Sequence, residues 1–254
     1  MNPLPTKHSG KLDALANIRV VLSHTSHPGN IGSTARAMKT MGLSQLALVN
    51  PRYFPHPEAD ALSAGAVDVL QAAQVHPTLE SALSGCVFAA GLTRRQRGLS
   101  HEPLDAREAA GRLIAIAHTQ PIALLFGNET SGLSNEELGK CQMLVTYPAN
   151  PDYPSLNLAA AVQIMAYEMR MAALGQARTE ATERELANLE DIEFFFSRLE
   201  ETLIDIRFLD PAHPKKLMPR LRRMFARKQL EKEELSILMG ILKQINLKGK
   251  VKVD

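Results

Sequence analysis

The sequence predicts an α/β fold with a mainly parallel sheet and helices on both of its faces. Two observations lead to this prediction. Short apolar runs typical of strands recur along residues 18–148, and segments with helical spacing of apolar residues separate them. Strands that alternate with helices form parallel sheets, because each helix carries the chain back to start the next strand. The chain has 254 residues, 45% of them hydrophobic and 22% charged, which suits one large domain with an appendage.

Strands are predicted where short apolar runs are bounded by turn-forming residues. They cover residues 18–23, 45–51, 86–93, 121–129 and 142–148. Pro51 ends the second strand, because a proline cannot donate a hydrogen bond to a neighbouring strand.

Helices are predicted between these strands and after the last of them, from apolar residues at intervals of three and four. They cover residues 29–42, 59–73, 78–85, 103–118, 134–141 and 155–174. Gly42 stands where a C-terminal cap belongs, and Ser134 and Glu137 have the spacing of a capping box. Ser155 is expected to cap the last of these helices.

A linker predicted at residues 175–185 divides the chain into a domain of residues 1–175 and a charged helical extension of residues 176–254. The extension is expected to hold two amphipathic helices with a basic helix between them, at residues 186–209, 215–228 and 234–245. No internal repeat accompanies these elements.

The charge of the extension is strongly divided. Residues 178–210 carry 4 basic and 10 acidic side chains, whereas residues 211–254 carry 12 basic and 4 acidic ones. A basic helix suits a polyanion such as RNA, and a solvated helix face is the alternative interpretation of the same pattern.

Several classes of protein are excluded by what the sequence lacks. It has no apolar run of 18 residues and no apolar core of a signal peptide near its start. Walker, GxGxxG and GxSxG motifs are absent, and no group of His and Cys has metal-ligand spacing. Cys86 and Cys141 fit no CxxC pattern, so we expect both to be small core residues in a reduced, cytoplasmic protein.

Three unusual loops follow predicted strands, at residues 27–36, 126–134 and 150–157. Each contains glycine or proline together with small polar side chains. In parallel sheets, ligands bind at the carboxyl ends of strands, and glycine lets the backbone approach a ligand closely. The loops therefore predict a ligand held mainly by backbone groups. Taken alone, residues 150–157 are equally explained as a proline-rich turn before a well-capped helix.

The three loops resemble the motifs of the SPOUT RNA methyltransferases, in particular the TrmH-type branch that methylates ribose 2′-oxygens. The matching motifs are N-x-G-x-x-x-R at 30–36, F-G-x-E-x-x-G-L at 126–133 and S-L-N at 155–157. The resemblance covers residues 18 to about 172, and the extension is similar to that of the TrmJ-type bacterial tRNA enzymes. It implies a C-terminal trefoil knot, an obligate homodimer and S-adenosylmethionine as the cofactor.

The resemblance also implies roles for individual residues. The catalytic set is Asn30, Arg36, Glu129, Ser155 and Asn157. The cofactor would be bound by Leu92, Thr93, Arg94, Gly127, Tyr147, Pro154, Ser155 and Leu156. Arg36 is interpreted as a positioned cation that stabilises the developing alkoxide, because a guanidinium is hard to deprotonate. An ion pair with Glu129 is its structural alternative. No metal is required, because the sulfonium already provides the leaving group.

RNA contacts are expected from Arg36, from the basic motif LTRRQR at residues 92–97 and from the basic helix. The predicted residues are Arg36, Arg95, Arg97, Lys215, Lys216, Arg220, Arg222 and Arg223. Pairing of the basic helix with the acidic residues 190–205, as a dimerisation device, is the alternative use of this segment.

These expectations predict a tRNA 2′-O-methyltransferase that acts on cytidine or uridine at nucleotide 32 of the anticodon loop. An rRNA 2′-O-methyltransferase of the same branch and a non-catalytic RNA-binding SPOUT protein are the alternatives. The intact motif residues argue against the non-catalytic alternative. The rRNA enzymes often carry an RNA-binding domain before the SPOUT domain, whereas about 17 residues precede the first strand here, which favours the tRNA enzyme. Because the methyl group is transferred to the ribose, the chemistry does not determine which base the target nucleotide carries.

Overall fold

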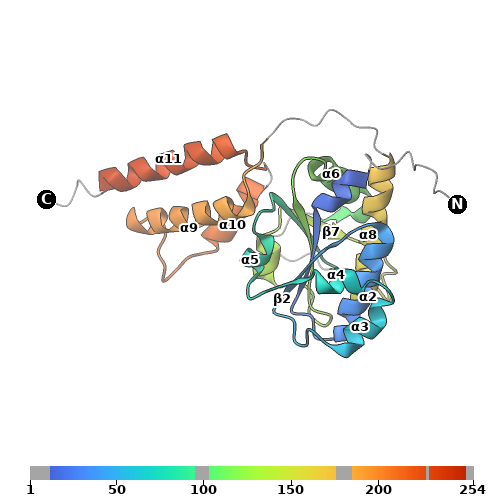
Figure 1. Cartoon of the computed structure of the whole chain (residues 1–254). Coiled ribbons are helices and arrows are strands. Elements are labelled where there is room, and N and C mark those ends of the chain that lie inside the picture. The colour runs from blue at the N-terminus through green and yellow to red at the C-terminus, as the bar shows by residue number, and fades with distance from the viewer. Residues whose placement is uncertain (1–11, 95–102, 176–184, 227–228, 250–254) are drawn as a thin grey trace.

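A computed structural model of the chain describes residues 12–94, 103–175, 185–226 and 229–249 (Figure 1). Within them, one seven-stranded sheet has the order β3-β2-β1-β6-β4-β7-β5. Every neighbouring pair of strands in this sheet is parallel. The strands are β1 (Ile18–Ser23), β2 (Gln45–Val49), β3 (Gln74–His76), β4 (Phe88–Leu92), β5 (Leu104–Asp105), β6 (Ile122–Phe126) and β7 (Met143–Thr146). The predicted parallel α/β fold is confirmed.

Helices cover both faces of the sheet (Figure 1). One face carries η1 (Asp13–Asn17), α2 (Pro28–Met41), α4 (Val67–Gln71), α6 (Ala106–Ala117) and α8 (Leu158–Gly175), with α3 (Pro57–Ser63) packed on α2. The other face carries α5 (Leu79–Leu83) and α7 (Asn135–Gly139). Gly42 caps α2 in the left-handed conformation, and Ser134 and Glu137 form the predicted capping box of α7.

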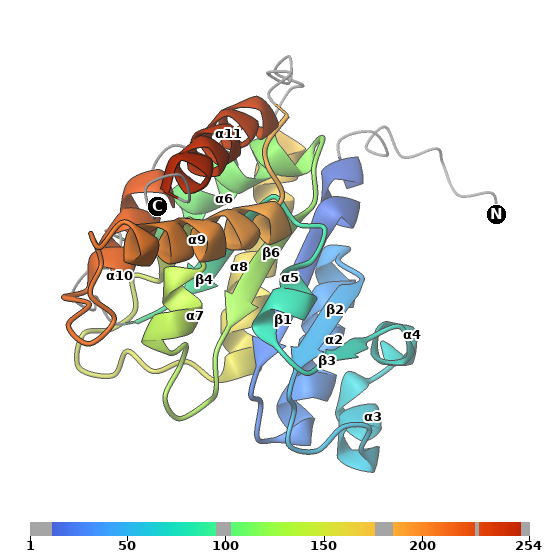
Figure 2. The same cartoon turned by 90° about the vertical axis from the view of Figure 1, so that its left-hand side faces the viewer.

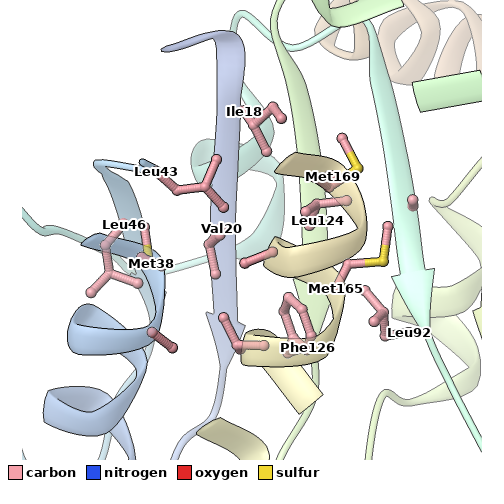
Figure 3. Packing of buried hydrophobic residues seen from close by; sticks show 14 of the residues in the cluster. Ile18, Val20, Met38, Leu43, Leu46, Leu92, Leu124, Phe126, Met165 and Met169 are labelled. Atoms are coloured by element: carbon pink, nitrogen blue, oxygen red, sulfur yellow. The ribbon is translucent and has the colours of Figure 1, made fainter. Parts of the chain in front are cut away.

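Side chains of each strand alternate between two hydrophobic clusters. Val20 and Leu22 of β1 face the α2 and α8 side, whereas Val21 between them faces the α5 and α7 side. In Figure 3, Met165 and Met169 of α8 lie over the strands on the first side. Because both faces are covered, the strands read as continuous apolar runs rather than as alternating ones.

The predicted helix at residues 59–73 is wrong as a single element. Ala64 and Gly65 adopt positive φ angles of 43° and 89°, and this left-handed backbone ends α3 before α4 begins. The helical spacing of apolar residues continues across the break, so the pattern alone did not reveal it. Two short strands, β3 and β5, were also missed, because three and two residues at the sheet edges carry little apolar pattern.

The start of α8 also differs from the prediction. The side-chain oxygen of Asn157 accepts hydrogen bonds from the backbone N–H groups of Ala159 and Ala160, at 2.9 and 3.3 Å. Asn157 is therefore the capping residue, and the assignment of that role to Ser155 is wrong. Ser155 is left exposed at the cavity described below.

The extension contains α9 (Leu189–Asp205), α10 (Leu217–Ala226) and α11 (Lys232–Gly249), which pack around their own small core (Figure 2). That core includes Phe195, Phe196 and Leu242. Leu189 instead joins the cluster on the second face of the sheet, and its backbone N–H donates to the Cys86 carbonyl at 2.9 Å. The extension is thus docked on the sheet domain through the start of α9.

Two sequence expectations concern segments outside the described residues. Most of the predicted linker lies in residues 176–184, and the path between β4 and β5 runs through residues 95–102. The trefoil knot therefore stays a prediction of the resemblance.

Candidate active site

A cavity of about 230 Å³ lies at the carboxyl ends of β4, β6 and β7, between the loops that follow these strands. This is the edge at which parallel α/β sheets bind ligands. The structure brings together at this cavity all the residues to which the resemblance gives a cofactor-binding role: Leu92, Thr93, Arg94, Gly127, Tyr147, Pro154, Ser155 and Leu156.

Gly127 allows the loop after β6 to fold back tightly and form one wall of the cavity. A Cβ atom at this position would lie 2.1 Å from the Leu133 nitrogen and 2.2 Å from the Gly132 carbonyl carbon. Gly132, with φ of 68°, donates its N–H to the Asn128 carbonyl at 2.8 Å. Any side chain at position 127 would therefore collide with backbone and open the loop.

Tyr147 follows β7 and is held in place through its hydroxyl. The hydroxyl donates to the Ala161 carbonyl of α8 at 2.5 Å. Burial raises the pKa of the Tyr147 phenol, so that the hydroxyl stays protonated and remains a donor. This bond fixes the residue between the cavity and the first turns of α8.

A chain of hydrogen bonds links the three motifs beside the cavity. Glu129 accepts from the side chain of Asn30 at 2.9 Å, and from the backbone and hydroxyl of Ser26 at 3.0 and 2.8 Å. Asn30 in turn accepts from the Asn157 side chain at 2.9 Å. The loops after β1, β6 and β7 are therefore joined through side chains as well as through the sheet.

Glu129 carries a negative charge into this network. Burial alone raises the pKa of its carboxyl, but the hydrogen bonds from Asn30 and Ser26 outweigh burial and leave the pKa below its ordinary value. Because Glu129 also lines the cavity, it offers negative charge to a cationic ligand there. Arg94 is exposed at the opposite loop and offers the complementary positive charge.

Arg36 lies apart from the residues that line the cavity. It is exposed on α2, six residues beyond Asn30. The acceptor atoms of Glu129 are taken by Ser26, His27 and Asn30, and the described residues show no ion pair between Arg36 and Glu129. The guanidinium is thus not held by the alternative partner that the sequence suggested.

The predicted RNA-binding residues of the basic segment, residues 215–228, differ in their exposure. Lys215, Lys216 and Arg220 are exposed, whereas Arg223 is half-buried. Arg222 forms an ion pair with Glu193 and lies 4.4 Å from the centre of the Phe196 ring. Its side chain is engaged within the extension, so an RNA phosphate would have to compete with Glu193 for Arg222. Arg95 and Arg97 lie outside the described residues.

Ser26 and His27 are site residues that the motifs did not mark. Their backbone N–H groups donate to Glu129 at 3.0 and 3.3 Å, and the sequence held no signal for this because the contact joins loops about 100 positions apart. Across the described residues, no helix is long and apolar enough to cross a membrane. The same part of the chain holds no group of three His, Cys, Asp or Glu side chains that could bind a metal ion.

Comparison with known proteins assigns a family to this arrangement. Residues 17–167 match the SpoU rRNA Methylase family, and residues 190–253 match the C-terminal domain of the tRNA methyltransferase TrmJ. The chain belongs to the SpoU methylase family. This SpoU methylase is 49% identical to the tRNA (cytidine/uridine/adenosine-2′-O-)-methyltransferase TrmJ of Pseudomonas aeruginosa, over 90% of this chain and 93% of that protein. It is also 49% identical to the tRNA (cytidine/uridine-2′-O-)-methyltransferase TrmJ of Citrobacter koseri, over 94% and 100%.

Solved structures agree with this assignment. TrmJ from Z. mobilis superposes with a TM-score of 0.80 at 31% identity, covering 90% of this SpoU methylase and 98% of that chain. The SpoU methyltransferase AviRb from Streptomyces viridochromogenes, in complex with the cofactor AdoMet, gives a TM-score of 0.50 at 26% identity, over 62% and 60%. The cavity fits such a group, since apolar Leu92 and Leu156 can flank an adenine while Glu129 and Arg94 complement charges of opposite sign.

Proposed function

We propose that this SpoU methylase is a tRNA 2′-O-ribose methyltransferase that uses S-adenosylmethionine and acts on cytidine or uridine. The observation that carries the proposal is the hydrogen-bonded chain from Glu129 through Asn30 to Asn157, which joins all three motifs beside the cavity. Nucleotide 32 of the anticodon loop is the target that the resemblance implies. The similarity to TrmJ proteins extends through the extension, which favours a tRNA rather than an rRNA substrate.

The cofactor would lie in the cavity at the ends of β4, β6 and β7. S-adenosylmethionine supplies a methyl group on a sulfonium sulfur, which is already a good leaving group. Leu92, Tyr147 and Leu156 would exclude water around the adenosine, and the ionised Glu129 would favour the cationic end. Thr93, Arg94, Gly127, Pro154 and Ser155 complete the proposed binding residues.

Positioning and charge would supply the catalysis. A ribose hydroxyl is a poor nucleophile, and holding it in line with the methyl group can contribute roughly 7–11 kcal/mol of the barrier. Asn30, Asn157 and Glu129 fix the loops on which this alignment depends. Ser155 lies exposed at the cavity wall, where its hydroxyl can orient the substrate. Arg36 is the proposed cation for the developing alkoxide and the adjacent phosphate.

A homodimer is part of this proposal. Exposed apolar side chains follow one side of α8, where Ile164, Tyr167 and Met171 are 38%, 46% and 45% accessible. A surface row of this kind suits burial against a second copy. Arg36 does not line the cavity of its own subunit, so a second subunit offers it a route to the transfer site. The resemblance to knotted enzymes also implies that the partner completes the site.

The exposed Lys215, Lys216 and Arg220 are the proposed tRNA-binding residues of the extension, with Arg223 beside them. We place the protein in the cytoplasm as a tRNA-modifying enzyme. A direct test incubates purified tRNA and rRNA with labelled S-adenosylmethionine and maps the methylated nucleoside. Methylation of a pyrimidine ribose in tRNA supports the proposal, whereas labelling of rRNA alone contradicts it. Calorimetry with and without EDTA checks whether the cofactor binds without a metal.

A further inference from the structure

Tyr153 is the most exposed of the large hydrophobic side chains in the described residues, with 79% of its surface accessible. It lies directly before Pro154, Ser155 and Leu156, which line the proposed cofactor cavity. An aromatic ring left in water at the rim of a site is unusual, because covering such a ring is favourable. Neither the motifs nor the cavity lining gives Tyr153 a role.

The loop around Tyr153 is built to hold its backbone still. The side-chain oxygen of Asn150 accepts from the Asp152 N–H at 3.0 Å, and the Asn150 carbonyl accepts from the Tyr153 N–H at 3.1 Å. Pro151 and Pro154 restrict the backbone on either side of this turn. The ring is therefore presented from a pre-ordered loop, so little backbone entropy is lost when it binds a partner.

The surroundings of Tyr153 suit a nucleotide better than a second protein subunit. Asn150, Asp152, Ser155 and Asn157 are polar and exposed in the same loop, so the ring stands among hydrogen-bonding groups. A stable protein interface needs a contiguous apolar core, and the exposed apolar row of α8 provides one further along the chain. Unstacked bases of single-stranded RNA, in contrast, commonly stack on isolated aromatic rings beside polar groups.

We propose that Tyr153 stacks on the base of the nucleotide whose ribose is methylated. This inference rests on the proposed function and adds a substrate-positioning residue to it. Stacking holds a base without reading its hydrogen-bonding edge, because every base has a π-face. Tyr153 would thereby fix the ribose next to the cavity and accept cytidine and uridine alike. It is a positioning residue, since the ring does not touch the reacting oxygen.

The experiment compares two ways of removing the same stack. One is Tyr153→Ala acting on an intact tRNA transcript, and the other is the wild-type enzyme acting on a transcript that is abasic at the mapped target but keeps its 2′-hydroxyl. Loss of one base–aromatic stack is expected to lower kcat/KM by roughly 10- to 100-fold in either case, mainly through KM. Tyr153→Ala acting on the abasic transcript should have a kcat/KM no lower than either change alone gives, because both changes remove the same contact.

Controls separate stacking from structural effects. Tyr153→Phe keeps the ring and is expected to retain most of the activity, and Tyr153→Ala should bind cofactor as tightly as the wild type by calorimetry. Tyr53→Ala removes another exposed tyrosine, in the loop after β2, and should leave kcat/KM close to that of the wild type.

Three results would overturn the inference. They are an unchanged kcat/KM for Tyr153→Ala, losses that multiply in the combined experiment, and conversion of Tyr153→Ala to monomers in sedimentation. The last result would make Tyr153 a subunit contact. A wild-type enzyme that methylates no tRNA in the same assay would instead overturn the proposed function, which keeps the two failures distinct.

Discussion

Arg222 of α10 and Glu193 of α9 form a bidentate ion pair, with nitrogen–oxygen distances of 2.5 and 2.9 Å. The same carboxylate lies 3.5 Å from the Lys140 ammonium, which follows α7 in the sheet domain and pairs with Glu80 of α5 at 2.6 Å. Lys140 has only 13% of its side chain exposed, so this network is better shielded than a surface pair. Glu193 thus links α10 to Lys140 at the end of α7, the helix that follows the loop of residues 126–134.

We expect Glu193→Gln and Arg222→Gln each to destabilise the extension, because each removes one member of a partly buried ion pair. Combined, the two substitutions should cost less than the sum of the single effects, with a coupling of about 0.5–3 kcal/mol. Calorimetric melting of the four proteins measures this coupling. Glu200→Gln changes an exposed carboxylate on the same helix and serves as the matched control. Strict additivity would show that the ion pair stabilises nothing.

Arg36→Ala is expected to leave cofactor binding near normal and to lower turnover by roughly 10²–10³, the usual loss on removing one preorganised charge. The physical reason is that Arg36 lies outside the cavity lining, so the proposed role of its charge is toward the substrate rather than the cofactor. Calorimetry and single-turnover methyl transfer measure the two effects separately. Lys39→Ala removes a cation from the same helix as a control. More than about a third of wild-type kcat in Arg36→Ala would contradict this role.

The basic extension should bind RNA through its exposed residues and not through Arg222. Replacing Lys215, Lys216 and Arg220 by Ala is expected to weaken tRNA binding and to lower the slope of log K against log salt by about 0.7–0.9 for each lost phosphate contact. Cofactor affinity and melting temperature should stay close to those of the wild type, since these side chains are exposed and make no ion pair with the described residues. Filter binding over a range of salt concentrations tests this, and an unchanged slope would assign the segment to assembly.

Tyr167→Arg should convert the protein to monomers, because it places a charge in the exposed apolar row of α8. Arg112→Ala, on the exposed side of α6, is the control and should leave the assembly intact. Sedimentation equilibrium separates a species near 27.9 kDa from one of twice that mass. A wild-type protein that is itself monomeric and active would refute the proposed dimer.

Glu129 makes the stability of the motif loops depend on pH. Its pKa is lower in the folded state than the ordinary value of 4.5, so the folded state favours the ionised carboxylate. The resulting stabilisation is complete above the ordinary pKa and is lost as the pH falls through the folded pKa. The melting temperatures of the wild type and Glu129→Gln should therefore differ most at neutral pH and converge in acid. A difference that does not change with pH would contradict this assignment.

The sequence by itself determined the class of fold, and the resemblance carried by its motifs named half of the residues that line the cavity. Strands that are apolar along their whole length must be buried on both faces of the sheet. The helical segments between them supply that cover, which predicts a parallel α/β sheet. Gly127 and Asn30 were named through the resemblance of their motifs, and at position 127 the structure supplies the physical reason, because any Cβ there would collide with backbone. Cys86 and Cys141 were correctly placed in the core, since cysteine is among the residue types that are most often buried.

The tertiary structure decided which of these residues act together. Ser26 contacts Glu129 across 103 positions of chain, and Arg222 pairs with Glu193 and lies over the ring of Phe196. Asn157 rather than Ser155 caps α8, although both residue types suit a cap. The contacts of Ser26 and Arg222 depend on distances between segments that are far apart in the chain, whereas the choice between Ser155 and Asn157 depends on the local backbone at the start of α8. The local sequence shows which interactions a side chain is able to make, whereas the tertiary structure determines which partner lies within reach.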